Sequence, residues 1–201
     1  SFIFFIGLVL VVQTQSMLKR FGAEASVSMV VTASFVREIG PVFAAIMFTG
    51  RIGTGIAAEL GSMVVTEQID AYRVFGADPV ARLAVPRVLA TTLMLPALTV
   101  LANVVGVFAG FLLVVFQLGE PGSLYLQGAL GILTRMDIFS CLIKGLAFGL
   151  IIGLIATNLG FRTPRATEAV GVSTTRTMVQ GVLSILVVDL VITKSLLVWG
   201  E

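Results

Sequence analysis

Apolar residues run along this chain in five long blocks separated by more polar connections. The blocks cover about residues 1–18, 27–50, 88–116, 138–159 and 177–199. A helix that crosses a bilayer needs about 17–25 mostly apolar residues, and the blocks lack the strict alternation of a membrane β-barrel strand. The pattern therefore predicts an all-α membrane protein with five transmembrane helices.

The first block is the shortest, because its apolar run meets Gln13 after 12 residues. Neither a basic start nor a small-residue cleavage site marks it as a signal peptide. We interpret it as a span that is truncated at its N-terminal end in this sequence.

Segment 56–87 differs in kind from the five blocks. Thr66, Asp70 and Arg73 recur on one side of a helix, and apolar residues recur on another. This spacing predicts an amphipathic helix that does not span the membrane. Two interpretations stay open: the helix lies on the membrane surface, or it docks a soluble partner.

Local signals mark where this amphipathic helix ends. Gly76 is a typical residue just after a helix C-terminus. Asp78 followed by Pro79 is typical of an N-cap and the first position of the next helix. We therefore expect a turn over residues 76–78.

The basic residues of the connections predict an orientation. Segments 51–87 and 160–176 contain seven arginines, against four basic residues in the opposite connections and near the C-terminus. Lys and Arg concentrate on the cytoplasmic side of membrane proteins. The two segments are therefore expected in the cytoplasm, and the C-terminus on the periplasmic side.

Composition supports a lipid environment and excludes several functions. Of 201 residues, 57% are hydrophobic and 12% are charged, whereas soluble domains have about 25% charged residues. A net charge of +2 does not suit a nucleic-acid binder. There is no histidine, Cys141 is the only cysteine, and Walker A, G-x-S-x-G and H-E-x-x-H motifs are missing. We predict no catalytic residue, metal or cofactor in this chain.

Four charged residues nevertheless lie well inside the predicted spans, away from their ends: Arg37, Glu38, Lys144 and Asp189. Each costs about 2.5–3.5 kcal/mol at a helix centre on insertion scales. Either Arg37 or Lys144 pairs with Glu38 or Asp189 for stability alone, or the charges line a hydrated path for a polar group.

Two further features adjoin these charges. Pro41 removes a backbone donor, leaves the carbonyl of Arg37 without its usual partner, and is expected to break or kink the helix. Asp137 shares a helix face with Lys144 and is also a candidate N-cap of the fourth span.

Glycines recur every four residues in the third and fourth spans, at Gly106, Gly110, Gly145, Gly149 and Gly153. Small residues at this spacing let helix backbones approach closely. The pattern predicts tight helix contacts without deciding between a neighbour in the same chain and one in a second copy.

Three stretches carry a family resemblance. They are the run that begins R-E-I-G-P-V-F-A-A at Arg37 and ends V-F-G-A-D-P, then R-M-D-I-F-S-C-L-I-K-G at 135–145, and G-V-S-T-T-R-T-M-V at 171–179. In these the chain resembles the MlaE/YrbE permeases, the membrane subunits of ABC transporters that work with MCE-domain lipid-binding proteins. Ile39, Tyr72 and Phe75 stand where that family usually has Leu, Leu and Met.

The resemblance implies a homodimer in the bacterial inner membrane that moves glycerophospholipids between inner and outer membranes and so maintains outer-membrane lipid asymmetry. It implies an MlaF-like ATPase subunit that binds ATP and Mg, an MlaD-like MCE-domain protein and a small MlaB-like STAS-domain subunit. It also implies that 56–87 is a coupling segment seated on the ATPase, with the candidate contacts Glu59, Thr66, Glu67, Asp70 and Arg73.

A phospholipid path needs a polar place for the head partway through the membrane. The candidates are Gln13, Arg37, Glu38, Pro41, Lys144 and Asp189. Two alternatives remain: a membrane scaffold whose charges only pair, and an ion-coupled transporter with a proton site at Glu38 or Asp189.

Overall fold

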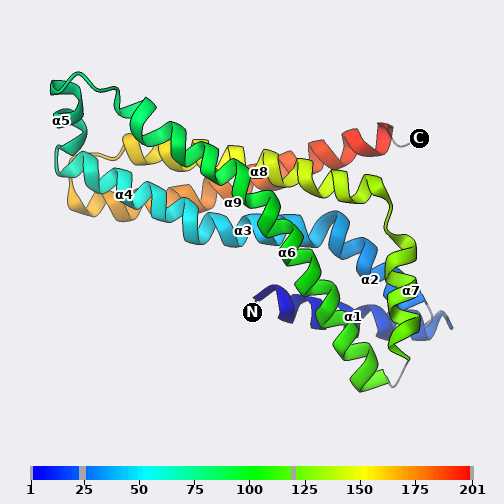
Figure 1. Ribbon diagram of the computed structural model, residues 1–201. Coiled ribbons are helices and arrows are strands. Elements are labelled where there is room, and N and C mark those ends of the chain that lie inside the picture. Colours follow the sequence, from blue (N-terminus) through cyan, green and yellow to red (C-terminus); the bar gives the residue numbers. More distant parts are fainter. Residues whose placement is uncertain (1, 23–25, 119–120, 200–201) are drawn as a thin grey trace. The chain divides into compact units, whose positions relative to one another are not determined.

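The computed structural model describes residues 2–22, 26–118 and 121–199 (Figure 1). These residues form helices joined by short connections, and none of them forms a strand. The α-helices are α1 (Phe2–Arg20), α2 (Val27–Ser34), α3 (Gly40–Phe48), α4 (Thr54–Val65), α5 (Gln68–Val74), α6 (Val85–Leu118), α7 (Gly122–Ile132), α8 (Arg135–Phe161) and α9 (Thr167–Trp199). The predicted all-α class is confirmed.

Within the described residues, five helical stretches are long and apolar enough to cross a membrane. They are Phe2–Arg20, Val27–Val65, Val80–Phe116, Arg135–Phe161 and Thr167–Leu196. One stretch corresponds to each predicted span, and four of them extend well beyond the predicted bounds because polar residues continue the helices past the apolar blocks. The short α7, which the apolar pattern did not predict, is not among them.

The second stretch is one continuous helical run, and the predicted break at Gly40-Pro41 is wrong. A π-helical turn, Phe35–Ile39, joins α2 to α3, and the N–H of Gly40 bonds to the carbonyl of Phe35. A proline ring clashes with the carbonyl four residues earlier, and a wider turn relieves that clash. The turn Val80–Ala84 stands in the same place relative to Pro86, which supports this explanation.

The chain folds as two compact units. Unit 1 comprises Ser1–Ala44 and Leu98–Ile143, and unit 2 comprises Ala45–Ala97 and Lys144–Glu201. Helices α3, α6 and α8 each contribute residues to both units.

The core of unit 1 forms where α1, α2, α6 and α7 meet. Buried Val11, Val31, Val114 and Tyr125 form one apolar cluster there. Helices α1 and α6 approach closely, because a Cβ added to Gly7 would lie 2.6 Å from the carbonyl oxygen of Gly106. The predicted close contact at Gly106 therefore has a neighbour in the same chain.

Unit 2 contains a second close helix contact, between α6 and α8, while α4 packs along α9. A Cβ added to Gly149 would lie 2.5 Å from the carbonyl oxygen of Thr91 and 2.9 Å from the Cα of Thr92. Gly153 faces Thr91 and Val88 in the same way. The fourth-span glycines thus bring two backbones of one chain together, as their spacing predicted.

Replacing Gly149 by Ala is expected to lower the free energy of unfolding by about 1–3 kcal/mol, because the methyl group overlaps backbone atoms that cannot rotate away. The measurement is the unfolding of the purified protein in mixed micelles. Gly171→Ala on α9 is the matched control, since nothing lies within 4 Å of its Cβ position. Equal stability of the two variants would contradict the close contact.

Candidate functional site

Unit 1 contains an ion pair within the membrane-spanning helices. The Nε of Arg37, in the first π-helical turn, lies 2.7 Å from Oδ1 of Asp137 on α8. The side chain of Arg37 is 49% exposed, whereas that of Asp137 is 10% exposed. The carboxylate therefore contacts two nitrogens of the guanidinium, while about half of the Arg37 side chain is exposed.

Asp137 also orders the start of α8. Its Oδ2 accepts hydrogen bonds from the backbone N–H of Thr134 at 2.9 Å and from the Thr134 hydroxyl at 2.8 Å. The bond from the Thr134 N–H to the acid three residues later is one half of a capping box, with Thr134 at the N-cap, while the N–H of Asp137 donates to the carbonyl of Thr134. Asp137 is therefore not the N-cap itself. Its hydrogen bonds with Thr134 fix the position of the carboxylate that pairs with Arg37.

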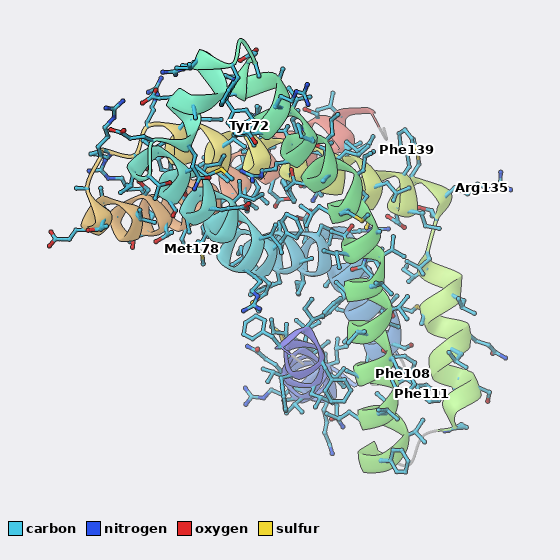
Figure 2. All side chains as sticks on the ribbon, turned by 60° about the vertical axis from the view of Figure 1, so that its left-hand side comes forward. Tyr72, Phe108, Phe111, Arg135, Phe139 and Met178 are labelled. Carbon is cyan, nitrogen blue, oxygen red and sulfur yellow. The ribbon has the colours of Figure 1, made fainter. Side chains whose placement is uncertain are left out.

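An apolar cavity of about 550 Å³ adjoins this ion pair in unit 1. Val36 and Ile138 line it, and they are the chain neighbours of the two paired residues. Phe108 and Phe111, which Figure 2 labels on the lower part of α6, also line it. A cavity of this size falls in the range of about 300–1,000 Å³ that is typical of small-molecule sites.

Three polar side chains interrupt the cavity lining. The Nδ2 of Asn103 donates to Sγ of Cys141 at 3.2 Å, and the Tyr125 hydroxyl donates to the carbonyl of Val107 at 3.3 Å. Burial raises the pKa of the Tyr125 phenol above its ordinary value, so the hydroxyl stays neutral. The cavity thus presents no formal charge of its own.

Unit 2 contains an ion pair between the fourth and fifth spans. The Nζ of Lys144 on α8 lies 2.9 Å from Oδ1 of Asp189 on α9. This pairing is one of those predicted from the sequence. The Lys144 side chain is only 1% exposed, so its ammonium is enclosed by protein.

The predicted coupling segment has a different shape from the single amphipathic helix expected. Helix α4 continues the second span to Val65, and Glu67 then adopts the left-handed conformation, with φ of 58°. Helix α5 begins at Gln68 and is anchored by Ile69, which packs with Leu60 and Leu83. Long-range packing therefore fixes a break that no local turn residue announces.

The end of the segment follows the prediction. Gly76 has φ of 72°, the left-handed conformation that is common for the residue just after a helix C-terminus. The N–H of Val80 donates to Oδ1 of Asp78 at 2.9 Å, which caps the following helix at the expected residue.

Ion pairs tie α5 to the connection between α8 and α9. Arg165 contacts Asp70 at 2.5 Å and Glu67 at 3.6 Å, and Arg73 contacts the second oxygen of Asp70 at 3.2 Å. Glu59 on α4 pairs with Arg87 at 2.7 Å. Sequence reasoning missed Arg165, although its position in the arginine-rich connection 160–176 was a signal.

The remaining predicted site residues lie in varied surroundings. Thr66 donates to the carbonyl of Ser62 at the end of α4. Gln13 is exposed on α1, Glu38 is half-buried, and Pro41 is buried.

Two glycines of the predicted helix-packing pattern remain, Gly110 and Gly145. A Cβ on Gly110 would lie 2.5 Å from the hydroxyl oxygen of Tyr125, and Gly145 is buried. Both observations place these glycines inside the fold of this chain.

The most exposed part of the coupling segment is apolar. Val74 and Phe75, at the end of α5, are 84% and 86% exposed. The sequence reasoning concentrated on the charged side of this segment and missed both residues. Figure 2 shows Tyr72 on the same short helix, and this residue packs with the cluster beneath α5.

Among the residues that the structure describes, no three His, Cys, Asp or Glu side chains come together as metal ligands would.

Five helical stretches long and apolar enough to span a membrane, with paired charges within them, indicate a multi-pass membrane protein. Comparison with known proteins narrows this class: the chain belongs to the MlaE permease family, which matches residues 1–195.

Similar proteins carry names that agree with this family. A probable ABC transporter permease protein of Rickettsia felis is 38% identical over 191 residues, which cover 95% of this chain and 74% of that protein. A protein of the same description from Synechocystis is 37% identical over 183 residues, covering 91% and 70%. The chloroplast protein TRIGALACTOSYLDIACYLGLYCEROL 1 of Arabidopsis thaliana is 37% identical over 190 residues, covering 94% and 54%.

Proposed function

We propose that this chain is the membrane subunit of an ABC transporter that moves glycerophospholipids between the inner and outer membranes of a bacterial envelope and so maintains outer-membrane lipid asymmetry. The observation that carries the proposal is the position of a half-exposed arginine, Arg37, beside an apolar cavity of about 550 Å³. A phospholipid has the same two parts, an anionic phosphate and apolar tails. The name of the Arabidopsis relative, which is that of a diacylglycerol lipid, supports a lipid cargo.

In this proposal the phosphate meets Arg37, and an acyl chain occupies the cavity lined by Val36 and Ile138. Arginine binds phosphate through paired N–H donors, and the bond to Asp137 holds the guanidinium plane in place. Gln13, Glu38 and Pro41 belong to the same proposed path. The enclosed Lys144–Asp189 pair contributes by holding α8 to α9.

ATP hydrolysis is assigned to a separate subunit, in keeping with the relatives named ABC transporter permeases. We propose that this ATPase docks on α5 through Val74 and Phe75, with Glu59, Thr66, Glu67, Asp70 and Arg73 holding or flanking that surface. The proposal also places α5 in the cytoplasm and the C-terminus in the periplasm. It further includes a homodimer, an MCE-domain partner and a small STAS-domain subunit.

Replacing Arg37 by Ala is expected to slow lipid transfer by about tenfold, which corresponds to the loss of one charge-assisted hydrogen bond of about 1.4 kcal/mol. The measurement is ATP-dependent transfer of a fluorescent phospholipid in liposomes that contain the whole complex. Arg135→Ala is the control, because Arg135 is exposed at the start of α8 (Figure 2).

A second variant separates transport from folding. Arg37→Ala leaves the Asp137 carboxylate without its guanidinium contact, whereas the double variant Arg37→Ala with Asp137→Ala removes both charges. The double variant is expected to fold, with a loss of about 0.5–2 kcal/mol because Asp137 also accepts the Thr134 bonds at the start of α8, and to be still slow in transfer. Full transfer by a stable double variant would contradict a headgroup role for Arg37, and transfer driven by a proton gradient without ATP would contradict the ABC assignment.

A further inference from the structure

Unit 2 contains a further cavity, larger than the one in unit 1. Its volume is about 770 Å³, and it lies between α5, the start of α6 and the end of α8. None of Arg37, Asp137, Lys144 and Asp189 lines it. Val74 and Phe75, the proposed docking residues, do not line it either. Asp70 and Arg73, which flank the proposed docking surface, do line it, so the cavity adjoins that surface but is separate from the proposed lipid path.

The lining divides into an apolar part and a basic part. Val85, Val88, Leu89 and Leu154 are apolar and belong to the spanning stretches of α6 and α8. Arg73, Arg162 and Arg165 are basic and lie on α5 and where α8 meets its connection to α9. Along α8 the lining therefore changes from the apolar Leu154, inside the spanning stretch, to the basic Arg162 and Arg165, just beyond its end.

The acidic groups of the cavity are already engaged. Both carboxylate oxygens of Asp70 contact arginines, one Arg73 and the other Arg165. Oδ1 of Asp78 accepts the N–H of Val80. The guanidinium of Arg162 makes no hydrogen bond or ion pair with the part of the chain that the structure describes. The cavity thus has one more positive than negative side chain and one guanidinium available to an anion.

We propose that this cavity binds one anionic phospholipid of the adjoining leaflet, as a resident lipid distinct from the transported one. The phosphate contacts Arg162, with Arg73 beside it, and an acyl chain lies against Val88 and Leu154. Basic pockets between spanning helices at a membrane surface are a known way to hold anionic headgroups. A resident lipid in this position fills the space beneath α5 and steadies the surface on which a partner docks.

The test counts lipids bound to the delipidated complex of this chain with its ATPase, by native mass spectrometry. Phosphatidylglycerol is the anionic probe, phosphatidylcholine is the neutral probe, and inorganic phosphate is the competitor. One phosphatidylglycerol per chain is expected to be retained about tenfold more tightly than phosphatidylcholine, with no displacement by millimolar phosphate. Equal retention of the two lipids, or displacement by phosphate, would overturn the proposal.

Two pairs of variants locate the bound lipid. Leu154→Trp fills the apolar part, whereas Leu150→Trp places the same ring one turn earlier on α8, outside the cavity. Arg162→Gln removes the available guanidinium, whereas Arg176→Gln changes an exposed arginine of α9 that does not line the cavity. The first variant of each pair is expected to lose one phosphatidylglycerol per chain, and the second to retain it.

Binding that is unchanged in both cavity variants would assign the lipid elsewhere and refute the site. Arg162 is exposed, so its variant folds normally and gives a clear answer even if Leu154→Trp is unstable. Lipid counting requires no transport, and the cavity variants leave Arg37 intact. A failure of this proposal is therefore distinguishable from a failure of the proposed transport function.

Discussion

Replacing Asp189 by Asn is expected to lower the free energy of unfolding by about 3–5 kcal/mol relative to the natural chain. The substitution keeps the shape of the side chain but removes the carboxylate that lies 2.9 Å from the enclosed ammonium of Lys144. Breaking a buried ion pair costs this much because one charge stays in a poorly polarisable interior without compensation. Unfolding in mixed micelles, followed by circular dichroism, measures the difference.

The double variant Lys144→Met with Asp189→Leu tests the cause. Removing both charges leaves no uncompensated ion, so its stability is expected to equal or exceed that of the natural chain. Lys194→Met serves as a surface control, because Lys194 is exposed on the same helix as Asp189. A double variant as unstable as Asp189→Asn would mean that packing, and not charge, sets the cost.

Replacing Phe75 by Asp is expected to abolish co-purification of the ATPase while the permease still folds. Phe75 is 86% exposed and contributes nothing to the apolar clusters beneath α5. Buried aromatic anchors commonly contribute 2 kcal/mol or more to an interface, and the substitution places a carboxylate in the same position. The measurement is recovery of the ATPase on an affinity tag attached to the permease.

Phe21→Asp provides the matched control, because Phe21 is also highly exposed but follows α1. Charge reversal at Glu67 and Asp70 gives a second comparison. These carboxylates contact Arg165 within the chain, so their reversal first loosens α5 and disturbs docking only indirectly. Undiminished ATPase recovery with Phe75→Asp would exclude the tip of α5 as the docking surface.

Sequence patterns predicted the features that depend on near neighbours. The five spans follow from the length of the apolar blocks, and the end of α5 follows from Gly76 and Asp78. The fourth-span glycines pack as their spacing requires. Pairing of Lys144 with Asp189 was among the expected arrangements because two charges enclosed in lipid stabilise each other.

Features that depend on distant parts of the chain escaped prediction. Arg37 pairs with Asp137, 100 positions away, an acid that was not among the pairing partners predicted for it. The break at Glu67 has no glycine or asparagine to announce it, and Arg165, 95 positions after Asp70, stabilises the helix that follows. The sequence pattern did not single out Val74 and Phe75, because their exposure depends on where the short helix α5 ends and packs.

Insertions and deletions are expected to be tolerated best at the π-helical turns. The described part of the chain has three of these turns: Phe35–Ile39, Thr49–Gly53 and Val80–Ala84. Each turn holds one residue more than an α-helical turn, and one residue rotates a helix by about 100°. Deleting a residue inside such a turn converts it to an ordinary α-helical turn. The helices before and after the turn then keep the same faces packed against the same neighbours. The same deletion in the middle of α4 or α6 would swing every later side chain to a new face. Length variation among homologous chains is therefore expected to concentrate at these three turns.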